Sequence, residues 1–197
     1  MKTIAITGVM GSGKSTVSKM LSEFYPVYNT DLINLQLQAK DHSGYQKIIQ
    51  EFGRDILNDN QEIDRQKLAA IVFTDVTAKE KLEQIMHPLI KDELDKLIKN
   101  TDSEFCFVEV PLLFEKDWDK FFDYSLNVSG NMTTIIERTA KNRNLTTQQV
   151  QERLNQQLSQ AEKENKSNFI INNDKSLEDL QEKVVQLINT LNQLEEE

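Results

Sequence analysis

The stretch GVMGSGKST, which begins at Gly8, concentrates three of the chain's six glycines just before a lysine and two hydroxyl residues. It matches the pattern G-x-x-x-x-G-K-[ST], in which successive backbone N–H groups surround phosphate oxygens. Gly8, Gly11 and Gly13 allow positive φ angles and a close approach of the backbone to an anion. Lys14 is placed to reach β- and γ-phosphates, and the Ser15 hydroxyl to hold Mg²⁺. The spacing therefore predicts a nucleotide site.

The residues on either side of this loop have the pattern that a phosphate-binding loop requires. The run TIAIT before it is apolar and β-branched, as in a buried strand. After it, Val17, Met20, Leu21 and Phe24 share one helical stripe. A strand-to-helix turn places the helix N-terminus beside the anion. We expect the phosphates to be held by Gly8, Gly11, Ser12, Gly13, Lys14, Ser15 and Thr16.

Composition limits the remaining possibilities. A chain of 197 residues suits one α/β core with helical insertions. A net charge of −9 argues against nucleic acid as a partner, so polyphosphates must be held by a few local cations. We see no signal peptide and no run long enough to span a membrane, and we expect a cytoplasmic protein. Cys106, in FCFV, is interpreted as a buried strand residue rather than a reactive thiol.

Strand patterns recur along the chain and alternate with helical ones. They are TIAIT, PVYN, FCFVEV, YSLNV and NFIIN. Such alternation predicts a parallel sheet with helices on both faces and ligands at the carboxyl ends of the strands. The predicted fold is α/β: a five-stranded parallel sheet in the three-layer α/β/α arrangement of P-loop NTPases, with a helical substrate-binding insertion and a helical lid.

Two intervals between strands are long enough to be insertions. About 75 residues separate PVYN from FCFVEV, far more than one crossover helix needs. We expect helices at 32–40, 44–53, 64–73, 78–86 and 89–99, with Asp64 as an N-cap and Pro88 in a first turn. The second insertion carries two predicted helices, a Thr146 N-cap and glutamines interpreted mostly as solvated. From Ser176 on, an amphipathic helix should pack on the sheet and fray into EEE.

A kinase and a nucleotide-hydrolysing switch are the two classes to separate. A guanine-binding N-K-x-D motif is missing, because NKSN at 165–168 lacks the aspartate. The large insertion and the basic residues of the second insertion, Arg138, Lys141 and Arg143 among them, favour a kinase with an acceptor pocket and a lid. Asp31, just after PVYN, is placed to accept a proton from an attacking hydroxyl. It is equally suited to cap a helix that begins at Leu32, and position alone leaves both readings open.

Five segments resemble the dephospho-coenzyme A kinase family over nearly the whole chain. They are TGVMGSGKST, YNTDLINLQL, IMHPLIKDEL, VEVPLLFE and RNLTTQQVQERLNQQ. The resemblance implies ATP- and Mg²⁺-dependent phosphorylation of the ribose 3′-hydroxyl of dephospho-CoA, the last step of coenzyme A synthesis. It implies a core at about 1–30, 101–130 and 168–197, a CoA-binding insertion at about 31–100 and a lid at about 131–167. ATP and dephospho-CoA are then the small-molecule partners.

The resemblance also assigns roles to residues that match the family's motifs. It implies that Asp31 acts as the base and that Glu109 holds Mg²⁺ through water, together with Ser15. His87 matches a His-Pro motif, either in substrate binding or as a structural histidine. Leu112, Leu113 and Phe114 line the acceptor pocket or fill the core. The implied catalytic residues are Lys14, Asp31, Arg138 and Arg143; the substrate-binding residues are Asp31, His87, Leu112 and Glu115; and Asn173 is expected near adenine.

The chain departs from the family's pattern at four places. Val9 replaces a usual glycine, and Asn29 replaces the first carboxylate of an Asp-x-Asp motif. Asn142 stands where an arginine is common, and INND lacks a glycine after Asn173. Two other readings remain: a different small P-loop kinase, for nucleosides or sugars, and a non-enzymatic nucleotide-binding module.

Overall fold

The computed structural model describes residues 1–195, and its internal contacts divide the chain into two units. One unit is Asn29–Thr101, and the other comprises Met1–Tyr28 and the chain from Asp102 on. The last two residues of the predicted frayed EEE end lie outside the described residues. Within residues 1–195, no helix is both long and apolar enough to cross a membrane.

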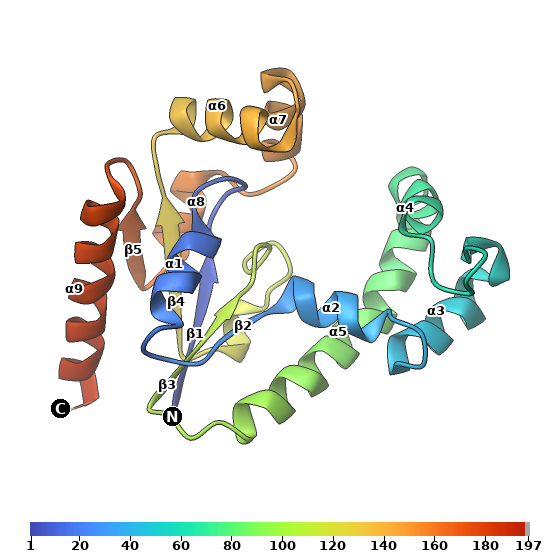
Figure 1. Cartoon of the computed structure of the whole chain (residues 1–197), viewed down its shortest axis with the longest axis horizontal. Coiled ribbons are helices and arrows are strands. Elements are labelled where there is room, and N and C mark those ends of the chain that lie inside the picture. The colour runs from blue at the N-terminus through green and yellow to red at the C-terminus, as the bar shows by residue number, and fades with distance from the viewer. Residues whose placement is uncertain (196–197) are drawn as a thin grey trace. The chain divides into compact units, whose positions relative to one another are not determined.

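A five-stranded sheet forms the centre of the unit that comprises Met1–Tyr28 and the chain from Asp102 on, in the order β2-β3-β1-β4-β5 (Figure 1). Strand β1 pairs in parallel with β3 and β4, and β4 pairs in parallel with β5. Ile4, Ala5 and Ile6 of β1 are fully buried, as expected for a parallel strand with neighbours on both sides and layers on both faces. The strands, all of them predicted, are β1 (Lys2–Thr7), β2 (Val27–Asn29), β3 (Phe105–Glu109), β4 (Tyr124–Ser129) and β5 (Phe169–Asn172).

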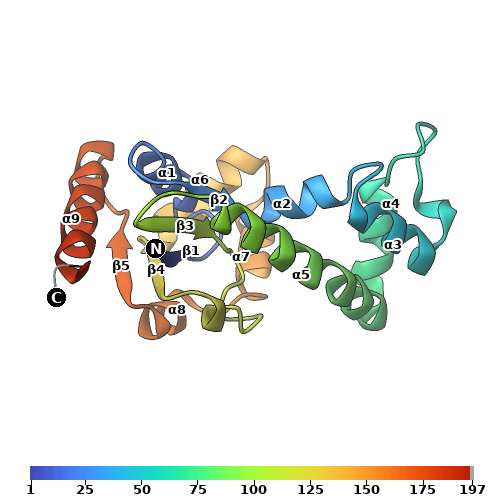
Figure 2. The same ribbon diagram turned by 90° about the horizontal axis from the view of Figure 1, so that it is seen from below.

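Helices on the two sides of this sheet complete three layers. Helices α1 (Lys14–Leu21) and α9 (Leu177–Glu195) share one apolar core with the strands, through side chains such as Val17, Leu180 and Val184. Helix α8 (Gln160–Lys166) contacts β4 and lies on the opposite side of the sheet from α1 (Figure 2). The predicted packing of the C-terminal amphipathic helix is therefore confirmed.

The unit Asn29–Thr101 is helical. Its elements are α2 (Thr30–Leu37), α3 (Ser43–Phe52), the short 3₁₀ helix η1 (Arg54–Ile56), α4 (Arg65–Thr74) and α5 (Val76–Lys99). Asp64 caps α4 as predicted, accepting from the N–H groups of Gln66 and Lys67.

The prediction of separate helices at 78–86 and 89–99 is wrong, because α5 runs without a break through Pro88. A proline inside a helix removes one backbone hydrogen bond and crowds the preceding turn. Two features keep α5 continuous. Asp75 caps its start by accepting from the N–H groups of Thr77 and Ala78, and α2, α3 and α4 all pack against it. Tertiary packing thus outweighs the local preference of one residue.

The second insertion holds three helices rather than the two predicted. They are α6 (Met132–Arg143), α7 (Thr147–Leu154) and α8. Thr146 caps α7 as predicted, and Gln149 completes a capping box by accepting from the Thr146 N–H. Ser159 and Glu162 form a second capping box, which begins the additional helix α8. A further 3₁₀ turn, η2 (Asp119–Phe121), precedes β4.

Cys106 is the second residue of β3 and is fully buried. Burial raises the pKa of its thiol to about 11, because the low-dielectric interior disfavours the thiolate. The interpretation of this residue as a buried strand position is confirmed.

Helices α6 and α7 are joined to the β1–α1 loop by a small apolar cluster, here called the lid cluster. Its buried members are Val9, Ile135, Val150 and Leu154. Val9 is only 2% exposed. Val9, which replaces a glycine in the family's pattern, is therefore the buried member that the loop adds to this cluster, and Met10 packs against it.

We predict that Val9→Ala lowers the free energy of unfolding by about 2 kcal/mol, from the lost methyl burial plus the cavity left behind. Chemical denaturation measures this change. The matched control is Val185→Ala on α9, where the side chain is 48% exposed; it should stay within about 0.5 kcal/mol of wild type. Equal effects of the two substitutions would contradict the packing described for Val9.

Candidate active site

The β1–α1 loop has the backbone that its glycines predict. Gly8, Gly11 and Gly13 have φ values of 147°, 81° and 107°. A Cβ atom on Gly13 would overlap the Asn173 amide, and one on Gly11 would overlap the Thr139 hydroxyl. Both the dihedral angles and the space around these two positions require glycine.

Helix α1 begins at this loop. Its N-cap residue is Gly13, which has no side chain to accept from the first N–H groups of the helix. Its first N–H groups and its dipole make this end favourable for an anion. The Lys14 ammonium folds back over the loop and donates to the backbone oxygens of Gly8 (3.0 Å) and Val9 (3.1 Å). Ser12 is buried in the loop, whereas Thr16 is exposed on the first turn of α1. The loop is therefore a cradle for phosphate with a cation in place.

Glu109 ends β3 next to the loop and is 6% exposed. Its carboxylate accepts from the Ser15 hydroxyl at 3.2 Å and from the Ser18 hydroxyl at 3.1 Å. The structure thus brings together Ser15 and Glu109, the predicted metal-binding pair. The sequence reasoning missed Ser18, although it lies three residues after Ser15 and so on the same helix face.

The chemistry of this pair fits Mg²⁺. Hydroxyl and carboxylate oxygens are the hard donors that this ion prefers, and it commonly takes only one or two protein ligands beside phosphates and water. No group of three or more His, Cys, Asp or Glu residues suited to a metal occurs among the described residues. The two oxygens from Ser15 and Glu109 match such a sparse set.

Three side chains from distant segments hold consecutive residues of the loop; they are called the loop braces below. The contacts run from Met10 N to Gln157 Oε1 (3.1 Å), from Arg138 Nη2 to the Gly11 oxygen (2.7 Å) and from Asn173 Nδ2 to the Ser12 oxygen (2.8 Å). Gln157 escaped the sequence reasoning because glutamines in this insertion were interpreted as mostly solvated. Its place in the segment RNLTTQQVQERLNQQ, which carries the family resemblance, is the signal that could have found it.

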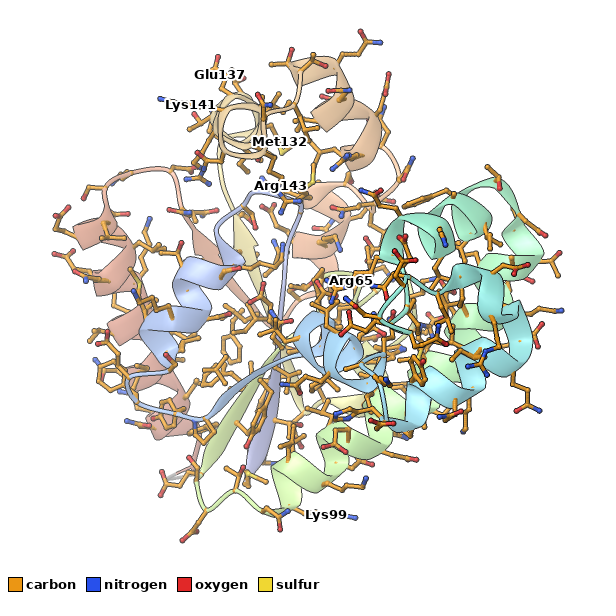
Figure 3. All side chains as sticks on the ribbon, turned by 45° about the vertical axis from the view of Figure 1, so that its right-hand side comes forward. Arg65, Lys99, Met132, Glu137, Lys141 and Arg143 are labelled. Atoms are coloured by element: carbon orange, nitrogen blue, oxygen red, sulfur yellow. The ribbon has the colours of Figure 1, made fainter. Side chains whose placement is uncertain are left out.

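Arg138 and Arg143 both reach the loop from α6, which lies at the same end of the sheet (Figure 1). Arg143 Nη1 is 3.6 Å from the Met10 sulfur. Figure 3 shows Arg143 on the side of α6 toward the loop and Glu137 and Lys141 on its outer side. The structure therefore places the two predicted lid arginines beside the phosphate cradle.

Asp31 lies in the first turn of α2, where the helix dipole favours negative charge. The N-cap of this helix is Asn29, whose Oδ1 accepts from the N–H groups of Asp31 (2.9 Å) and Leu32 (3.1 Å). The reading of Asp31 as the N-cap of a helix beginning at Leu32 is therefore wrong. The helix begins earlier because strand β2 runs directly into it. His87 is half-buried inside α5, just before Pro88.

The residues after β3 divide between the core and the surface. Leu113 and Phe114 are buried, as the core interpretation predicts, whereas Leu112 is 38% exposed. The Glu115 carboxylate lies 2.8 Å from the Lys163 ammonium and accepts from the Leu158 N–H at 3.0 Å. Burial lowers the pKa of Lys163, and the contact with Glu115 opposes that shift.

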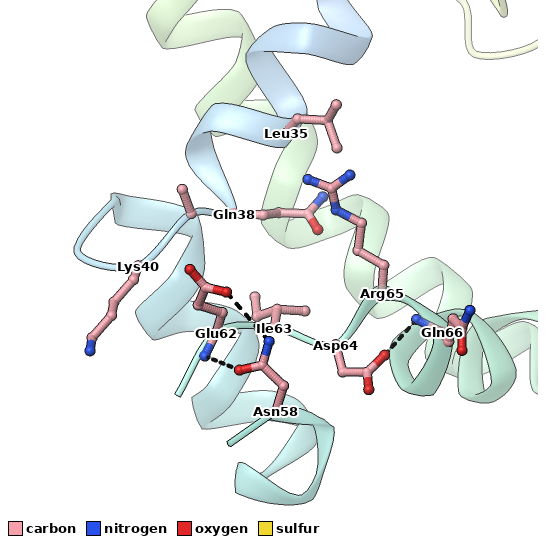
Figure 4. A pocket seen from close by; sticks show the side chains of 10 residues that line it. Leu35, Gln38, Lys40, Asn58, Glu62, Ile63, Asp64, Arg65 and Gln66 are labelled. Atoms are coloured by element: carbon pink, nitrogen blue, oxygen red, sulfur yellow. Dashed lines mark hydrogen bonds between the residues drawn. The ribbon is translucent and has the colours of Figure 1, made fainter. Parts of the chain in front are cut away.

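The unit Asn29–Thr101 has a pocket of its own, of about 550 Å³ (Figure 4). Its lining combines apolar side chains with two cations and two carboxylates, and the Arg65 guanidinium extends toward Leu35 and Gln38. Such a mixture suits a ligand that has both charged and apolar parts. The lining residues are Leu35, Gln38, Ala39, Lys40, Asn58, Glu62, Ile63, Asp64, Arg65 and Gln66.

Comparison with known proteins identifies the family. The profile described as Dephospho-CoA kinase matches residues 2–179. The dephospho-CoA kinase of Listeria innocua is 33% identical over 192 residues, covering 95% of this chain and 96% of the relative. Among solved structures, a Thermus thermophilus protein aligns with a TM-score of 0.84 at 29% identity, over 96% of this chain and 97% of that one. The dephospho-CoA kinase of Campylobacter jejuni aligns with a TM-score of 0.70 at 26% identity, over 96% of each chain. The phosphate cradle thus sits in a chain that matches this kinase family over residues 2–179: this chain belongs to the dephospho-CoA kinase family.

Proposed function

We propose that this protein transfers the γ-phosphoryl group of ATP to the ribose 3′-hydroxyl of dephospho-CoA, giving coenzyme A in the final step of its biosynthesis. The match of a single kinase family over residues 2–179 carries this assignment. The phosphate cradle at the start of α1 supports it, because a kinase must hold the triphosphate of its donor.

The direct test is to incubate the purified protein with ATP, Mg²⁺ and separate acceptors: dephospho-CoA, a nucleoside and a sugar. We expect the mass of dephospho-CoA to increase by one phosphate, with nuclear magnetic resonance placing it on the 3′-oxygen. Phosphorylation of the nucleoside or the sugar, with none of dephospho-CoA, would overturn this proposal. The protein would then be a different small P-loop kinase.

Binding of ATP involves the loop residues Gly8, Gly11, Ser12, Gly13, Lys14, Ser15 and Thr16. Their N–H groups and the Lys14 ammonium stabilise the negative charge of the β- and γ-phosphates. Lys14 already lies over the loop, so it can exchange its bonds to Gly8 and Val9 for phosphate oxygens. Asn173 touches the loop backbone in this structure, and we assign it a place beside the bound nucleotide.

Ser15 and Glu109 would hold Mg²⁺, Ser15 directly and Glu109 through water. When bound, this ion would supply positive charge that offsets the negative charge of the phosphates. The Glu109 carboxylate also orients the Ser15 hydroxyl by accepting its hydrogen bond. Ser18 stabilises the same carboxylate from the next turn of α1.

The lid arginines neutralise charge that develops on the transferred group. Arg138 donates to the Gly11 oxygen at 2.7 Å, whereas the contact of Arg143 with the loop is to the soft Met10 sulfur at 3.6 Å. Arg143 is therefore the easier of the two to redirect toward phosphate oxygens.

We predict that Arg143→Ala lowers kcat at least about tenfold and weakens ATP binding in the absence of acceptor by less, because an interaction gained only in the closed or transition state appears in turnover. Steady-state kinetics and calorimetric titration with ATP give the two quantities. Lys141→Ala, on the outer side of the same helix, is the matched control and should resemble wild type. If instead Lys141→Ala carries the loss, Lys141 is the lid cation.

The acceptor side is assigned to the unit Asn29–Thr101. Asp31 is the carboxylate that accepts or orients the proton of the 3′-hydroxyl. It is not the N-cap of α2, because Asn29 has that role. The pocket between Leu35 and Gln66 offers Lys40 and Arg65 to a diphosphate and apolar surface to a pantetheine arm. His87 and the exposed Leu112 are assigned to acceptor binding on the resemblance of their motifs to the family's.

We predict that Asp31→Asn lowers turnover at least about a hundredfold, since an amide keeps the shape but takes no proton. Its melting temperature and ATP affinity should remain near wild type. Asn29→Ala should behave in the opposite way: it removes the helix cap, at about 1 kcal/mol of stability, and leaves the carboxylate in place. Turnover of Asp31→Asn within a few-fold of wild type would assign proton transfer to another group.

A further inference from the structure

Lys163 and Glu115 form a buried ion pair that the reaction described above does not use. The Lys163 side chain is fully buried, and that of Glu115 is 13% exposed. Their charged groups are 2.8 Å apart, and Lys163 Nζ also donates to the Pro111 oxygen at 3.2 Å. A buried charge pair is costly to desolvate, so its place in the fold invites a role beyond stability.

The pair lies between two segments that both reach the phosphate cradle. Pro111 and Glu115 belong to the loop that follows β3. This loop begins just after Glu109, and Pro111 is two residues beyond it. Lys163 belongs to α8, and the turn before this helix contains Leu158, whose N–H donates to the Glu115 carboxylate. Lys166, one turn further along α8, lies 5.9 Å above the ring of Phe114 in the same loop.

Leu158 links this pair to the phosphate loop through its neighbour. Gln157 accepts the Met10 N–H through its side chain, at 3.1 Å. Because the two residues are adjacent, a carboxylate that fixes the Leu158 N–H also fixes the backbone from which Gln157 reaches the loop. The contacts therefore run from Lys163 to Glu115, then to the 157–158 turn, and then to Met10.

We propose that Glu115 and Lys163 are positioning residues for ATP: through the 157–158 turn they hold the phosphate loop in its binding conformation. This inference rests on the proposed function. It gives Glu115 a role on the ATP side of the reaction, in place of the acceptor contact that the family resemblance implies for it.

The test is a double-mutant cycle of Glu115→Gln, Lys163→Met and the two combined, with Gln157→Ala as a fourth variant. Calorimetric titration with ATP alone gives its affinity, and steady-state kinetics give KM for ATP and for dephospho-CoA. Circular dichroism at the assay temperature establishes that each variant is folded. The combined variant removes both charges, so it remains testable if a single substitution, which leaves one charge buried alone, prevents folding.

We expect every variant to bind ATP about tenfold more weakly and to raise KM for ATP, with KM for dephospho-CoA within about twofold of wild type. The combined variant should bind ATP no more weakly than the worse of the two single variants, because Glu115 and Lys163 act through one contact. The control is Glu93→Gln with Lys96→Met, an exposed ion pair on α5 with the same two charges; it should bind ATP as wild type does.

Two results would overturn the proposal. A rise in KM for dephospho-CoA with unchanged ATP affinity would make Glu115 an acceptor ligand. Folded variants with wild-type ATP affinity would make the pair purely structural. The ATP titrations contain no acceptor, so they decide this inference even if the wild-type protein fails to phosphorylate dephospho-CoA, the result that would overturn the proposed function instead.

Discussion

The loop between β1 and α1 has to present its N–H groups to an anion, and this leaves its backbone without the partners that a helix or strand provides. Polar backbone groups near a protein core need hydrogen bonds from elsewhere. The loop braces supply them, from three segments more than a hundred residues away in the chain. Helix α6, the segment that contains Gln157 and the residue after β5 are therefore tied to the phosphate loop by these hydrogen bonds.

An acidic protein that binds polyphosphate needs local positive charge at the phosphate site, because its overall charge repels the ligand. The net charge is −9, and several lysines are already paired: Lys163 with Glu115, Lys183 with Asp179 and Lys2 with Asp123. The cations at the phosphate loop differ, because Lys14 and Arg138 rest on backbone oxygens of the loop itself. A neutral carbonyl competes with phosphate far less than a carboxylate does. Backbone oxygens of the loop thus help to hold these two cations beside the phosphate cradle.

Much of this arrangement could be predicted from the sequence, because the signals are local. Strands buried on both faces show as apolar β-branched runs, and the glycine spacing of the loop reflects dihedral angles that other residues avoid. What could not be predicted depends on partners far along the chain. Lys163 lies among the polar residues of the second insertion, where a solvated side chain is the usual expectation. Only the fold places Glu115 beside it. A proline normally marks the start of a helix, but α5 continues through Pro88 because three other helices pack against it. The cap of α2 follows from where β2 ends, which makes Asn29 rather than Asp31 the N-cap and leaves Asp31 in the first turn.

The burial of Cys106 has a consequence for the chemistry of the substrate. Dephospho-CoA and coenzyme A both end in a pantetheine thiol, and thiols exchange with protein cysteines through a thiolate that attacks a disulfide. The chain contains a single cysteine, and it is fully buried in β3 with a pKa of about 11. At neutral pH it offers neither access nor a thiolate. The protein can therefore handle a reactive thiol at every turnover without becoming covalently joined to its own substrate or product.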